Sequence, residues 1–124
     1  MFDDIAALMS MVCTRLRLDG IVVVPSHYHV AARWHGRMHF LDPVAEGRFR
    51  ALDQVLSGLS LAEASSALEF GRVVDRETGA RVGYRPAAMI MPASEPLRRH
   101  FDDAWAREVE AAQAELRLEL EPRR

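Results

Sequence analysis

The sequence predicts a single α+β domain in which an antiparallel twisted sheet packs against helices, in the order αβββαββα. Three observations support this. Apolar residues recur at helical spacing near both ends of the chain, β-branched runs with glycine turns lie between, and a capped helical region lies at the centre. The 124 residues suffice for one hydrophobic core, so residues 1–124 are expected to form one domain.

The first element is expected to be a helix over residues 3–18, capped by Asp3 or Asp4. One face of this helix is apolar, with Ile5, Leu8, Met9, Val12, Cys13 and Leu16. Gly20 is expected to end the helix in the left-handed conformation. The chain has one cysteine, so no internal disulfide is possible, and we interpret Cys13 as a small buried side chain.

Residues 21–42 are expected to form a three-stranded meander. The run "IVVVP" is typical of a strand, Pro25 suits a turn, and His35-Gly36 suits a two-residue hairpin loop. Alternation along the strands would place one set on the same face: Val30, Ala32, Trp34, His39 and Leu41.

Four of the five histidines lie within residues 26–40. In the meander, His27 and His29 would share a face with Asp42, whereas His39 would point away and His35 would lie in the turn. Two imidazoles and a carboxylate are the minimum for a metal site. If the protein were a small enzyme, these three residues would be the only candidates in the sequence for its pocket. The alternative is a pair of imidazoles on a half-exposed strand, with His29 opposite Asp42. We interpret the cluster as structural and expect neither a metal nor another cofactor.

Residues 44–70 are expected to be helical. Leu52, Val55 and Leu56 belong to one apolar face, and Ser60 with Glu63 forms a capping box. The segment "GLSLAEASSALEFGR" is similar to the first half of a helix-turn-helix, which leaves a DNA-binding regulator as an alternative. The next segment, "GRVVDRETGARVGY", makes a poor recognition helix because of its glycines and valines.

Residues 72–91 are expected to form a hairpin around Gly79, and residues 95–120 a long last helix. Asp75 and Glu77 would flank the tight turn, so we interpret them as solvated rather than catalytic. Ser94 would cap the helix, whose apolar face would hold Leu97, Phe101, Trp105, Val109, Ala112, Leu116 and Leu120.

Composition argues against several classes of protein. Lysine and asparagine are absent, which removes the P-loop lysine and any Schiff-base lysine, and one cysteine removes multi-cysteine zinc sites. The net charge of −2 disfavours a general nucleic-acid binder. The sequence has no signal-peptide pattern and no membrane-length apolar run, so we expect a cytoplasmic protein.

Three segments carry a resemblance to a known family: "ALDQVLSGL", "ALEFGRVVDRETGARVGY" and "EPLRRHFDDAWAREVEAAQAEL". They are similar to the central leucine-rich helix, the strand–turn–strand and the closing helix of the class I chaperones of type III secretion, the Tir-chaperone family. The predicted element order also resembles that family over nearly the whole chain. The histidine-rich segment is not a mark of the family.

The resemblance implies a homodimer without enzymatic activity, which holds the N-terminal segment of a secreted effector in an extended form and has the secretion ATPase as a further partner. Candidate effector-binding residues are Leu8, Val12, Val30, Ala32, Trp34 and Leu41. The dimer contact would involve Leu52, Val55, Leu56 and Val73. The alternative is that all of these are core residues. A small phage- or plasmid-type inhibitor or regulatory binding protein fits the same composition.

Overall fold

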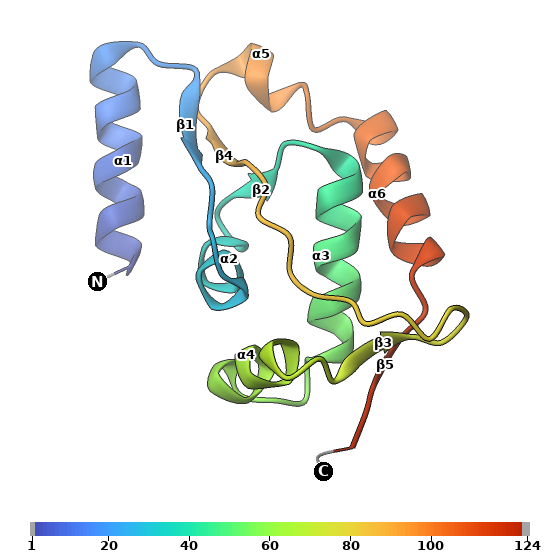
Figure 1. The fold of residues 1–124 in the computed structure, drawn as a ribbon. Helices are drawn as coiled ribbons and strands as arrows, with labels where there is room; N and C mark the ends of the chain where they lie inside the picture. Colours follow the sequence, from blue (N-terminus) through green and yellow to red (C-terminus); the bar gives the residue numbers. More distant parts are fainter. Residues whose placement is uncertain (1, 123–124) are drawn as a thin grey trace.

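The computed structural model describes residues 2–122 and confirms the α+β class, but not the αβββαββα order. The elements follow one another as α1 (Phe2–Leu16), β1 (Gly20–Val23), α2 (Tyr28–Trp34), β2 (His39–Phe40), α3 (Pro43–Val55), α4 (Leu61–Glu69), β3 (Val73–Asp75), β4 (Met89–Pro92), α5 (Glu95–Arg98), α6 (Asp103–Glu115) and β5 (Leu118–Leu120) (Figure 1).

The strands form two small antiparallel sheets. The first has the order β1-β4-β2, so the latest of its strands in the chain lies in the middle. Within it, Ile21 pairs with Met91, and His39 pairs with Ile90. The second sheet joins β3 to β5, with Val74 opposite Glu119. The first sheet therefore joins strands from both halves of the chain, whereas both strands of the second sheet come from its second half.

The predicted meander over residues 21–42 is wrong, because its middle segment is the helix α2. Tyr28 and Ala31 are three residues apart and both are buried, a spacing that suits a helix and not a strand. Gly36 does not have a positive φ, so the two-residue hairpin loop cannot form. Moreover, β1 and β2 pair with β4 and not with each other.

The helical region over residues 44–70 is confirmed as α3 and α4. The side chain of Asp42 accepts a hydrogen bond from the Val44 N–H at the start of α3. The predicted capping box of Ser60 and Glu63 starts α4, with both of its hydrogen bonds present.

Helix α3 packs closely against α6. A Cβ atom on Gly47 would lie 2.5 Å from the Val109 carbonyl oxygen and 2.7 Å from the Cβ of Ala112. Glycine is therefore what allows these two helices to approach each other at this level.

The hairpin over residues 72–91 forms only around its turn. Gly79 has a φ of +70°, as predicted, and the Asp75 N–H donates to the Ala80 carbonyl oxygen at 2.9 Å. Beyond the turn a single bridge joins Val74 and Arg81. β3 then pairs with β5, and β4 belongs to the other sheet, so the prediction of one continuous hairpin is wrong.

The single helix over residues 95–120 is also wrong. Asp102 accepts a hydrogen bond from the Trp105 N–H and caps α6 as a separate helix after the short α5. At the other end, Leu116 has an extended backbone and Leu118–Leu120 forms β5.

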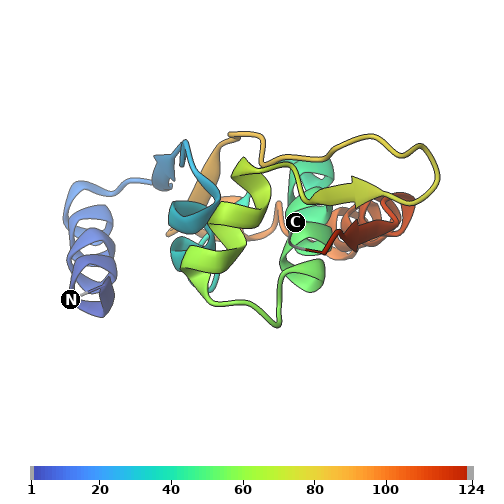
Figure 2. The ribbon, with the colours of Figure 1, turned by 60° about the horizontal axis from the view of Figure 1, so that its bottom comes forward.

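The hydrophobic core lies between α2, α3, α4 and the two sheets. Its buried residues are Tyr28, Ala31, Met38, Phe40, Phe49, Leu52, Leu56, Ala64, Ala67, Val73 and Met89. Helix α1 lies outside this core: Figures 1 and 2 both show it at the margin of the molecule, with the other helices beyond β1.

The end of α1 differs from the prediction. Arg17, with a φ of 53°, takes the left-handed conformation that was expected of Gly20. Gly20 instead lies in β1, where a Cβ atom would be 2.6 Å from the Met91 carbonyl oxygen. The glycine is thus required by close strand packing.

Candidate functional site

The structure divides the histidines differently from the sequence prediction. His27 and His29 are exposed near the start of α2, with ring centroids 5.5 Å apart, and the His27 Nδ1 is 2.9 Å from the Ser26 hydroxyl. Because this segment is a helix and not a strand, the predicted cross-strand pair of His29 and Asp42 does not exist. Asp42 serves as the cap of α3.

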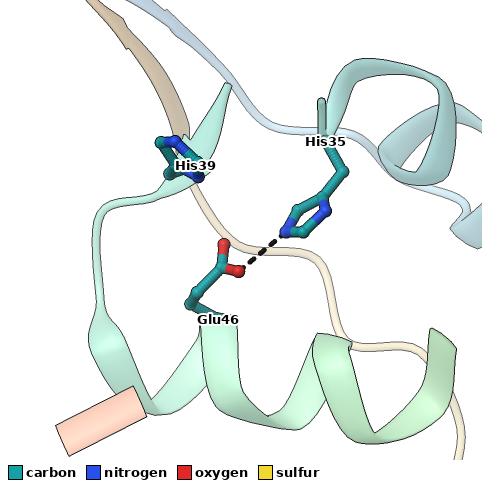
Figure 3. A group of neighbouring side chains, drawn as sticks. All are labelled: His35, His39 and Glu46. Atoms are coloured by element: carbon teal, nitrogen blue, oxygen red, sulfur yellow. Dashed lines mark hydrogen bonds and ion pairs between the residues drawn. The ribbon is translucent and has the colours of Figure 1, made fainter. Parts of the chain in front are cut away.

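A different group gathers around a buried carboxylate: His35, His39 and Glu46. One possible ligand atom from each residue lies within 4.8 Å of the others. Figure 3 shows the two imidazole rings on either side of the Glu46 carboxylate. His35 follows the end of α2, His39 begins β2, and Glu46 lies in the first turn of α3. Among the described residues this is the one group of three potential metal ligands.

Glu46 is fully buried and accepts hydrogen bonds from three of the described residues. Its Oε2 accepts from the Nε2 of His35 at 2.7 Å and from the Nε of Arg50 at 2.6 Å. Its Oε1 accepts from the Phe40 N–H at 3.2 Å. Burial alone would raise the pKa of Glu46, but the bonds to His35 and Arg50 bring that pKa below its ordinary value. The carboxylate is therefore ionised at neutral pH, which makes the Nε2 of His35 a donor.

His39 lies in less polar surroundings. Its ring centroid is 5.6 Å from that of Phe101 and 6.0 Å from that of Trp105. Burial lowers the pKa of His39, and the charge of Glu46 only partly opposes this. The Nδ1 atom of His39 is buried and has no hydrogen-bond partner. A neutral imidazole with an unused nitrogen is a potential metal ligand.

Sequence reasoning missed this group because it placed His35 and His39 in a hairpin. With residues 28–34 taken as a helix, the four-residue spacing of His35 and His39 and an acid in the first turn of the next capped helix would have been the signal.

The predicted effector-binding residues do not form one surface. Leu8 and Val12 on α1 are exposed, and so is Leu41, but Leu41 lies beside α6, where its carbonyl oxygen accepts from the Trp105 Nε1 at 3.3 Å. The other three are half-buried on α2: Val30, Ala32 and Trp34. Ala32 and Trp34 pack against the core.

The predicted dimer residues are mostly covered within one chain. Leu52, Leu56 and Val73 are at most 3% exposed, and Val55 is half-buried against the core. The first three therefore have almost no surface to offer a second copy, and any self-contact must use other residues.

The remaining candidates have structural roles. Asp75 accepts a hydrogen bond from the Glu77 N–H within the turn, and Glu77 lies 3.5 Å from Arg117. Cys13 is buried, as expected. Helix α4 is followed by β3, so no described helix takes the position of a recognition helix after it.

Comparison with known proteins found no matching family model, no matching curated protein and no matching solved structure. Within residues 2–122, every helix is too short or too polar to span a bilayer.

Proposed function

We propose that the protein is a non-enzymatic protein-binding module that dimerises through α1 and holds a segment of a client protein beside this contact. The observation that carries the proposal is the row of exposed apolar side chains on α1. Ile5, Leu8, Met11, Val12 and Leu16 are between 39% and 65% exposed. A contiguous apolar row of this kind marks an interaction site, whereas scattered exposed residues do not.

The spacing along α1 suits a second copy of the same helix. In an antiparallel pair related by a two-fold axis, each residue meets a residue equally far from the opposite end. With the axis at the level of Ser10 along the helix, Leu8 faces Val12 of the second copy, and Ile5 lies within one residue of the level of its Leu16. The apolar row is therefore complementary to itself.

Charge supports the same pairing. α1 carries Asp4 near its start and Arg15 in its last turn, both exposed and both on the side of the helix between Leu8 and Met11. Antiparallel pairing brings Asp4 of one copy beside Arg15 of the other, on both sides of the axis. Parallel pairing would instead place like charges together, which is unfavourable.

The client is the part of the proposal that the resemblance implies: an extended apolar segment of a secreted effector. Three exposed apolar residues lie in and directly around β1: Leu18, Val22 and Val24. β1 is an edge strand of its sheet, and an extended segment can pair with such an edge. Client binding is supported by this apolar surface and not by the element order, because the observed order differs from that of the family.

The dimer is tested by light scattering coupled to gel filtration. The unmodified protein at about 100 μM should give twice the chain mass. Leu8→Arg should give a monomer, because the two-fold axis would place an unpaired charge against the apolar Val12 at two positions of the contact. Since Leu8 is exposed in the single chain, the variant should keep its helix content by circular dichroism. Ser10→Arg, on the opposite side of α1, is the matched control and should remain dimeric. A monomeric unmodified protein would exclude the dimer.

Client binding is tested with a reduced, alkylated and permanently unfolded protein as the probe. The double substitution Val22→Arg/Val24→Arg should weaken binding at least about tenfold. Phe70→Arg removes an exposed apolar side chain elsewhere on the surface and should leave binding unchanged. An equal loss of binding in both variants would indicate non-specific hydrophobic binding and would contradict a client site at β1.

A further inference from the structure

The geometry points to a site for one divalent transition-metal ion, zinc in the first place, held by His35, His39 and Glu46. Three features on separate elements support it: a buried ionised carboxylate, two imidazoles on either side of it (Figure 3), and a buried imidazole nitrogen without a partner. The site lies away from α1, so it goes beyond the proposed function and is tested separately.

The distances leave little to rearrange. The three potential ligand atoms lie within 4.8 Å of one another, whereas ligand atoms around a tetrahedral zinc are about 3.4 Å apart, given bonds near 2.0–2.2 Å. Rotation of the two imidazole rings, which are only half-buried, is enough to close the difference. The Nε2 atom of His35 lies 2.7 Å from the Oε2 atom of Glu46, and these two atoms would move slightly apart as the ion enters between them.

The donor set favours particular ions. Two imidazole nitrogens and one carboxylate oxygen suit Zn²⁺, Co²⁺ or Ni²⁺, whereas Mg²⁺ and Ca²⁺ prefer oxygen ligands alone. Three protein ligands leave a fourth position for a water molecule. The rings of Phe101 and Trp105 beside His39 make this side of the site apolar, which strengthens electrostatic contacts within it.

Binding must displace two groups from the Glu46 carboxylate. The hydrogen on the Nε2 of His35 leaves that nitrogen, either to the Nδ1 of the same ring or to solvent, and its lone pair then binds the ion. The guanidinium of Arg50, 2.6 Å from the Oε2 of Glu46, is a cation that competes with the metal. Because the Arg50 side chain is 38% exposed, it can turn outward into water.

The test uses the purified full chain, stripped with a chelator and titrated with ZnSO₄ and with CoCl₂. The unmodified protein should bind about one equivalent of Zn²⁺ by calorimetry, its melting temperature should rise with added zinc, and Co²⁺ should give visible absorption bands. His39→Gln should lower the affinity at least about 100-fold, since losing even an outer-shell partner lowers metal affinity 10–100-fold.

The matched control is His27→Gln/His29→Gln, which removes the exposed imidazole pair and should retain full binding. The metal-free variants are compared by circular dichroism, which detects a folding defect in His39→Gln. If His39→Gln is misfolded, His35→Gln gives the second measurement, and it too should lose the site.

Arg50→Gln gives the sharpest outcome. If Arg50 competes with the ion, this variant should bind Zn²⁺ about tenfold more tightly while the metal-free protein becomes less stable. A purely structural cluster would show the loss of stability without any gain in affinity. Absence of stoichiometric binding in both the unmodified protein and Arg50→Gln would overturn the proposal, as would binding that depends on His27 and His29 alone.

Discussion

Helices α1 and α6 are similar in length, 15 and 13 residues, but they place their apolar residues very differently. In α6, Val109 is completely buried against α3. In α1, Leu8 and Leu16 are 60% and 65% exposed. Both helices have an amphipathic sequence, so the difference comes from what each one meets.

Gly47 explains why the apolar face of α6 is covered within the chain. It removes the side chain that would keep α3 and α6 apart, and the two backbones approach closely over Val109 and Ala112. α1 packs beside the edge strand β1 and buries Cys13 there. An amphipathic pattern therefore shows that a helix needs a partner, without showing whether that partner lies in the same chain.

The largest expected effect separates a core leucine from an α1 leucine. Leu56→Ala should lower the free energy of unfolding by about 2–5 kcal/mol, because it leaves a cavity in the core. Leu8→Ala should change it by less than about 0.5 kcal/mol in dilute solution, where α1 is exposed. Urea denaturation at low protein concentration measures both. Similar losses in the two variants would show that α1 is packed in the single chain.

The next effect concerns the close approach of α3 and α6. Gly47→Ala should lower the free energy of unfolding by about 1–3 kcal/mol, because its Cβ atom would press on the backbone of α6. Gly58→Ala is the control, since nothing lies within 4 Å of its added Cβ atom. An unchanged midpoint for Gly47→Ala would mean that the two helices can separate without cost.

A smaller effect is expected at the start of α6. Asp102→Ala should lower the free energy of unfolding by about 1 kcal/mol, because the Trp105 N–H loses its acceptor. Asp103→Ala keeps the cap and removes a charge next to it, so it serves as the control. Thermal unfolding measures both variants, and an equal loss of stability in the two would contradict the prediction.

The smallest effect is a pH dependence. Burial and the neighbouring Asp53 raise the pKa of Tyr28 well above its ordinary value of 10.0. The folded chain therefore holds this proton more tightly than the unfolded chain. The resulting stabilisation is complete below pH 10 and is lost as the pH rises beyond the unfolded value.

Tyr28→Phe should lack this pH-dependent stabilisation. Between pH 8 and pH 10.5 the free energy of unfolding of the unmodified protein should fall by about 0.8 kcal/mol more than that of the variant, because Tyr28 ionises in the unfolded chain and stays protonated in the folded one. Tyr84, whose pKa is also raised by burial, titrates in both proteins and cancels in the difference. Parallel urea midpoints at the two pH values would show that Tyr28 titrates normally in the folded chain.

Local signals predicted the start of α4 and the turn at Gly79. Ser60 with Glu63 and Gly79 behaved as expected, because the interactions that fix them lie within a few residues. The α+β class and the buried Cys13 also followed from sequence.

Pairing between distant segments could not be predicted in this way. Leu116, Leu118 and Leu120 alternate with charged residues, which is a strand pattern, but the four-residue step from Ala112 to Leu116 and Leu120 made a helix equally consistent. The partner of this strand, β3, lies more than forty residues earlier. The candidate metal group was missed for the same reason, since it depends on α2 being a helix.

The position of β4 in the middle of its sheet has a consequence for synthesis on the ribosome. β1 is made early, but its hydrogen-bonding partner arrives only with residues 89–92, and β3 must wait for residues 118–120. The nascent chain thus carries unpaired strands until nearly all of the described residues have emerged, and contacts between such distant segments form slowly. We therefore expect α1 and the unpaired β1 to be exposed to holding chaperones until residues 89–92 have emerged, and β3 to remain unpaired until residues 118–120 have emerged.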